Sequence, residues 1–78
     1  MIRGPNEARS ILLKRIAWMT LDLEDKSHLS DGVRESIQAH IEAIRYVLEK
    51  LDLFDEEKLA HYIAFARETR AKRKAAAA

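Results

Sequence analysis

The chain carries three successive stretches in which apolar residues recur every three or four positions. These are Leu12, Ile16, Met19 and Leu23 in the first stretch, Val33, Ile37, Ile41, Ile44, Leu48 and Leu51 in the second, and Leu59, Tyr62, Ile63 and Ala66 in the third. Such steps return to one face of a helix that has 3.6 residues per turn. The pattern therefore predicts three amphipathic helices that pack face to face.

Residues that begin helices place the boundaries. Pro5 opens the first helix, because proline at the first helical position loses no hydrogen bond. Ser30 or Asp31 can cap the second helix, and Asp55 is a natural cap for the third. The turn before Asp55 has no glycine or proline, so one continuous kinked helix is an open alternative. We predict helices over about residues 5–25, 31–52 and 56–73.

The connection over residues 27–32 is short, which predicts an antiparallel hairpin of the first two helices. The predicted fold class is all-α, an antiparallel helical hairpin plus a third helix, in a single domain over residues 1–74. Residues 75–78, all alanine, are interpreted as a cloning scar or a frayed tail. A chain of 78 residues without cysteine forms a small core and no disulfide, so we expect two copies to assemble into a dimeric helical bundle.

The first helix carries more apolar surface than one neighbour can cover. Ile11 and Trp18 lie about 110° to one side of its stripe, and Leu13 lies about 100° to the other. If the third helix covers the Leu13 side, the Ile11/Trp18 side is left for an intermolecular contact; otherwise Trp18 is ordinary core under the third helix. The candidate protein-interface residues are Ile11, Arg15, Trp18, Met19 and Asp22.

Two other aromatic residues have ambiguous positions. Tyr46 lies opposite the apolar stripe of the second helix, so it is either a solvated side chain or part of a second contact surface. Phe65 lies about 120° from Leu59 on the third helix, and it can belong to the core or to an interface.

Basic residues gather at the end of the third helix. The candidates for contact with nucleic acid or an acidic partner are Arg67, Arg70, Lys72, Arg73 and Lys74. Positive charge also stabilises the negative end of a helix dipole, which is the simpler explanation. A contact with phosphate groups is the alternative. The net charge of +1 disfavours nucleic acid, because nucleic-acid-binding domains are usually strongly basic.

The sequence contains no recognisable catalytic or metal-binding motif. Its three histidines, His28, His40 and His61, lack the spacing of a metal-binding helix, and the two glycines form no phosphate-binding loop. We expect no catalytic residue, no metal and no cofactor. An enzyme with a polar pocket at a subunit interface, lined by His40 or by arginines of the first helix, is a minor alternative.

Acidic residues have basic neighbours four positions away on the predicted helices. Asp22 precedes Lys26, Glu68 precedes Lys72, and Arg45 precedes Glu49. Pairs at this spacing stabilise solvated helix faces, so they indicate surface rather than acid–base chemistry.

The longest apolar run, residues 11–13, is far shorter than the roughly 18 residues that span a membrane. The N-terminal segment lacks the apolar core of a signal peptide, so we predict a cytoplasmic protein. We predict a small non-enzymatic adaptor or regulatory protein that acts through protein–protein contacts of amphipathic helix faces, as a homodimer. The alternative is a nucleic-acid-associated regulator that uses the basic end of the third helix.

Overall fold

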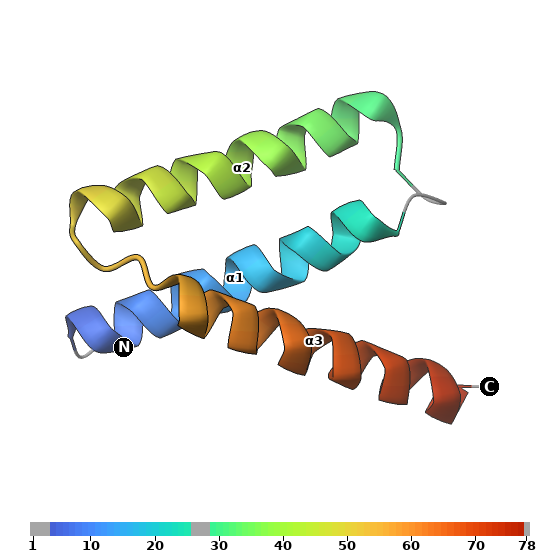
Figure 1. The fold of residues 1–78 in the computed structure, drawn as a ribbon. Coiled ribbons are helices and arrows are strands. Elements are labelled where there is room, and N and C mark those ends of the chain that lie inside the picture. The colour runs from blue at the N-terminus through green and yellow to red at the C-terminus, as the bar shows by residue number, and fades with distance from the viewer. Residues whose placement is uncertain (1–3, 26–28, 78) are drawn as a thin grey trace.

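The computed structural model describes residues 4–25 and 29–77, and its elements are three helices: α1 (Pro5–Glu24), α2 (Asp31–Lys50) and α3 (Glu56–Ala77) (Figure 1). The predicted all-α class with three helices is therefore confirmed. α1 and α2 run in opposite directions, as the hairpin predicts. Residues 26–28 of the connection between them lie outside the described part of the chain.

Two of the helices begin with a side-chain cap. The Ser30 hydroxyl accepts a hydrogen bond from the Val33 backbone N–H at 3.3 Å, so Ser30 rather than Asp31 is the cap of α2. The Lys58 backbone N–H donates to Asp55 Oδ1 at 3.0 Å at the start of α3. α1 begins with Pro5 at its first position, after Gly4. These local signals explain why the helices begin where the sequence predicts.

A C-terminal cap separates α2 from α3. Asp52 has a φ of 58°, in the left-handed region, and the Leu53 backbone N–H donates to the Leu48 carbonyl at 2.8 Å. This is the bonding pattern of a Schellman motif, in which glycine is the usual left-handed residue and aspartate is tolerated. The continuous kinked helix is therefore excluded, and Leu53 turns back to pack against the core.

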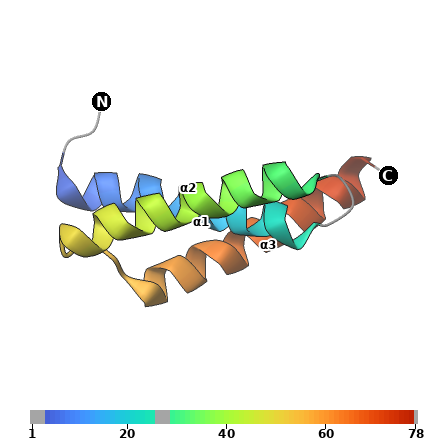
Figure 2. The ribbon, with the colours of Figure 1, turned by 90° about the horizontal axis from the view of Figure 1, so that it is seen from above.

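α3 continues to Ala77, beyond the end expected near residue 73. Alanine has the highest helix propensity, so the terminal alanine run extends the helix. Figures 1 and 2 both show this end of α3 extending past the C-terminal end of α1.

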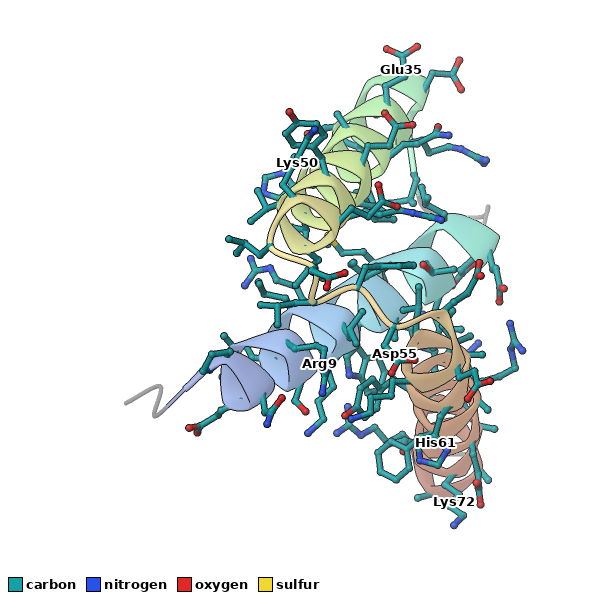
Figure 3. The ribbon with its side chains drawn as sticks, turned by 60° about the vertical axis from the view of Figure 1, so that its left-hand side comes forward. Arg9, Glu35, Lys50, Asp55, His61 and Lys72 are labelled. Atoms are coloured by element: carbon teal, nitrogen blue, oxygen red, sulfur yellow. The ribbon has the colours of Figure 1, made fainter. Side chains whose placement is uncertain are left out.

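α1 is the central helix of the fold. α2 and α3 each pack along α1. The backbones of α2 and α3 do not come close to each other (Figures 1 and 3). Leu13, Ile16 and Leu48 form the fully buried centre. Partly buried side chains from all three helices and the turn surround it, namely Leu12, Ile41, Ile44, Leu53, Phe54, Leu59 and Tyr62.

A second buried row on α1 faces α3. Leu13, Ala17 and Leu21 recur every four residues and are all buried, and Ala66 is buried on α3. The small side chains of Ala17 and Ala66 allow the two helix backbones to approach closely. Leu21, which the apolar stripe of the sequence leaves out, is therefore core because α3 covers that side of α1.

Candidate functional site

The five interface candidates of α1 lie along one side of that helix, and the structure covers them unequally. Ile11 is 46% exposed and Arg15 is exposed, whereas Trp18, Met19 and Asp22 are half-buried. The first half of this surface is therefore open to solvent, and the second half is partly covered by the rest of the chain.

The end of α3 provides that cover. The Arg70 and Arg73 guanidinium groups lie 5.5 and 5.7 Å from the centroid of the Trp18 ring, within cation–π range. Arg70 Nη2 also donates to Asp22 Oδ1 at 2.8 Å. Two groups of residues that the sequence assigns to separate surfaces, the α1 interface candidates and the basic helix end, thus meet within one chain.

The other basic residues of α3 are also largely paired. Arg67 Nη2 lies 2.6 Å from Glu24 Oε1, and Lys72 Nζ lies 3.2 Å from Glu68 Oε1. Only Lys74 of the five candidates has no ion pair or ring contact within residues 4–25 and 29–77. Much of the positive charge of the helix end is therefore already balanced by carboxylates of the same chain.

The expected charge pairs within helices have mixed outcomes. The pairs Glu68–Lys72 and Arg45–Glu49 are confirmed, the second at 3.1 Å. Asp22 pairs with Arg70 of α3, and Lys26, its expected partner, lies outside the described residues.

Val33 and Leu51, the two ends of the apolar stripe predicted for the second helix, are exposed rather than packed, and they adjoin a surface with two further exposed apolar side chains that the stripe left out. Val33 is 46% exposed, Tyr46 60%, Val47 47% and Leu51 61%. The other exposed residues on the same side of the helix are Ser36, Ala39, His40, Ala43 and Lys50. At 100° per residue, these nine residues occupy an arc of about 140°, which we call the α2 flank.

The carboxylates of α2 gather along one edge of this flank. Its four carboxylates, Asp31, Glu35, Glu42 and Glu49, lie within about 40° of one another on the helical wheel. The flank contains none of them, and Lys50 is its only formally charged residue at neutral pH. The same helix therefore presents an acidic side and an almost uncharged side to solvent.

The flank is open because α2 has one neighbour. α1 covers only the stripe that contains Ile41, Ile44 and Leu48, while α3 packs on another side of α1. Figure 3 shows Lys50 on the side of α2 that faces away from α3. A shallow, mainly apolar groove runs along the base of the flank and joins it to α1; it is lined by Leu12, His40, Ala43, Ile44 and Val47.

The histidines lie apart from any ligand set. His40 and His61 are exposed, and no three His, Cys, Asp or Glu side chains among the described residues gather as a metal site would require. His28 lies outside the described residues. Within the same part of the chain, no helix has the length and apolar character to cross a membrane.

The fold and these surfaces define a small all-α protein whose central helix is covered on two sides and whose second helix has an open apolar flank. No family model matches the chain, and no curated protein or solved structure is significantly similar to it. The function must therefore be inferred from the surfaces of the chain itself.

Proposed function

We propose that this chain is a small, non-enzymatic adaptor or regulatory protein of the cytoplasm that forms a homodimer and acts through protein–protein contacts of its helix faces. One observation carries the proposal. The chain exposes 5933 Å², whereas a compact monomer of its mass, 9.0 kDa, exposes about 4,850 Å². A chain this open for its mass leaves surface available for contact with a second protein.

The composition of the open surface supports the same proposal. Part of the excess area is the polar end of α3, but four large apolar side chains are exposed together on α2. Contiguous apolar surface on a soluble protein usually marks an interaction site. The exposed part of the α1 face, at Ile11 and Arg15, is a second and separate surface. A homodimer built on one of these surfaces presents two copies of the other to a further protein.

The nucleic-acid alternative receives less support. Arg67, Arg70 and Lys72 lie in ion pairs with carboxylates, so a phosphate backbone would have to displace those partners. If the alternative held, affinity would fall steeply with salt, and truncation after Thr69 would abolish binding. The enzyme alternative is weakened in a similar way, because the groove beside His40 is otherwise lined by apolar side chains.

Two measurements on the purified chain test the proposal. Light scattering coupled to size exclusion, over a concentration series, should give the mass of a dimer; a monomer at every concentration would contradict the homodimer.

The immobilised chain should retain a defined protein from an extract of its own cells. A variant with Ile11→Ser and Arg15→Glu should lose that protein, and Lys58→Glu, an exposed change on α3, should keep it. Retention of nothing but the chain itself would remove the adaptor role.

A further inference from the structure

The interface candidates of α1 form one row, and the end of α3 covers half of it. Ile11, Arg15, Trp18 and Asp22 recur every three or four residues along one side of α1. The first two are exposed, whereas Trp18 and Asp22 are half-buried where the end of α3 contacts them. Tryptophan is enriched among the few residues that carry most of the binding energy of an interface. The covered half therefore contains the strongest anchor that this face offers to a partner.

Charge rather than apolar packing holds this cover in place. Ala66 is the last buried residue of α3, since residues 67–76 are all exposed or half-buried. Three arginines join this end to α1: Arg67 pairs with Glu24, Arg70 pairs with Asp22, and Arg70 and Arg73 lie over the Trp18 ring. Such contacts are individually weak where water reaches them. The end of α3 is therefore held less firmly than the half that precedes Ala66.

Two further features separate residues 67–77 from the rest of α3. The Thr69 hydroxyl donates to the Phe65 carbonyl at 2.9 Å, a bond that competes with the hydrogen bonds of the helix itself and favours bending. Beyond it, an open cleft lies between the ends of α1 and α3, with Leu21 on one side and Ala71 on the other. The two helix ends are therefore incompletely packed against each other.

We propose that residues 67–77 form an autoinhibitory strap, which closes over the Trp18 half of the α1 face and opens to admit a protein partner. The inhibition rests on the adaptor function proposed above, in which another protein binds the α1 face. In the closed chain that partner reaches only the half at Ile11 and Arg15. A partner that needs the whole row binds only the open chains, so its affinity is reduced by the fraction that is open.

Arg70→Glu tests the opening. It replaces the ion pair with Asp22 and the cation–π contact with Trp18 by a repulsion between two carboxylates, so the ratio of open to closed chains should rise about 10-fold. Trp18 is the only tryptophan, and its quenching by acrylamide should move toward that of the chain unfolded in urea. Lys72→Glu, an exposed position of the same helix end with the same change of charge, should keep the wild-type quenching.

A second substitution should reverse the first. Adding Asp22→Arg to Arg70→Glu restores an ion pair of opposite polarity between α1 and α3, so the quenching should return toward the wild type. A general destabilisation of α3 would not be repaired in this way. Far-UV circular dichroism checks that each variant keeps its helices, and light scattering checks that all are compared in the same assembly state.

Retention of a partner tests the inhibition. Where affinity is limited by the open fraction, Arg70→Glu should raise it by up to about 10-fold. The immobilised variant should therefore retain more of the protein that the wild type retains from the same extract, and Lys72→Glu should retain the wild-type amount. Adding Ile11→Ser and Arg15→Glu to Arg70→Glu should abolish the retention, because these side chains form the open half of the same face.

The possible results separate the strap from the adaptor function. Quenching that rises in Arg70→Glu and is reversed by Asp22→Arg, together with increased retention, supports the strap. Unchanged quenching overturns it, because the end of α3 would then be a fixed part of the fold, while the adaptor function would stand on retention by the wild type. Increased quenching with unchanged retention overturns the autoinhibitory role. A chain that retains no protein in any variant contradicts both the adaptor function and its inhibition.

Discussion

α2 and α3 pack against two sides of the same helix, yet they leave very different surfaces to solvent. The outward side of α3 is rich in charge, with residues such as Lys58, Glu68 and Lys72, and the one large apolar side chain among them is Phe65, which is 61% exposed and therefore not part of the core. The outward flank of α2 is apolar or small over most of its length. Water solvates the first surface well and the second poorly. The comparison teaches that the composition of an uncovered helix side, rather than its area, locates an interaction surface.

The largest expected effect on stability comes from removing the contact that holds α2 to α1. Leu48 is fully buried against Leu13 and Ile16, so Leu48→Ala should lower the free energy of unfolding by about 2–5 kcal/mol. Urea denaturation followed by circular dichroism measures this change. At about 0.05–0.15 kcal/mol per residue, the whole chain is only several kcal/mol stable, so the variant should be close to unfolded.

Val47→Ala is the matched control for Leu48→Ala, because Val47 is the neighbouring residue on the open flank. Measured at a concentration low enough for monomer, it should cost less than about 1 kcal/mol. Equal losses for the two variants would mean that the two sides of α2 are not as different as the burial indicates.

The contact between α1 and α3 should respond to added volume. Ala66 is buried on α3, so Ala66→Leu should cost about 1–3 kcal/mol through overpacking. The exposed Ala64→Leu on the same helix should change stability by less than about 0.5 kcal/mol. Thermal unfolding resolves the difference, because 1 kcal/mol shifts the Tm of a domain this small by about 4–8 °C. A neutral Ala66→Leu would contradict close packing of α1 and α3.

The end of α3 should depend on charge more weakly. Asp22→Asn removes the partner of Arg70, and a partly exposed ion pair is worth about 0.2–1 kcal/mol. Trp18 is the only tryptophan and lies under Arg70, so its emission should change as the end of α3 loosens. The stability difference from the wild type should shrink in 1 M salt, where the Debye length is about 3 Å. An unchanged emission spectrum together with unchanged stability would contradict a role for the Asp22–Arg70 pair in holding this end of α3.

The sequence predicted the features that local chemistry determines. Ser30 and Asp55 act within three residues of their own positions, so the starts of α2 and α3 could be predicted without the fold. The end of α2 was harder, because its left-handed residue is Asp52 where glycine is the usual signal.

Which sides of the helices are covered by tertiary packing could not be predicted from the sequence. Leu21 lies opposite the apolar stripe of α1, and only the position of α3 makes it core. The α2 flank was missed because the stripe predicted for this helix follows large aliphatic residues, so it assigns Val33 and Leu51 to the packed face and leaves out Ala39 and Ala43. A usable signal was present: all four carboxylates of α2 lie on one side of the helix. That asymmetry indicates an open flank only once the structure has shown that α3 leaves α2 uncovered.

The smallest expected effects on stability come from substituting two exposed residues, Lys72 and Tyr46. Lys72→Ala breaks the pair with Glu68, worth about 0.2–0.5 kcal/mol, and alanine's higher helix propensity offsets part of the loss. Tyr46→Ala should also change the stability of the monomer by less than about 0.5 kcal/mol, since the side chain is mostly exposed. If the homodimer forms through the α2 flank, light scattering should nevertheless separate the two variants, because only Tyr46 lies on that flank. If both variants dimerise like the wild type, the apolar flank of α2 has no more role in assembly than the charged side of α3.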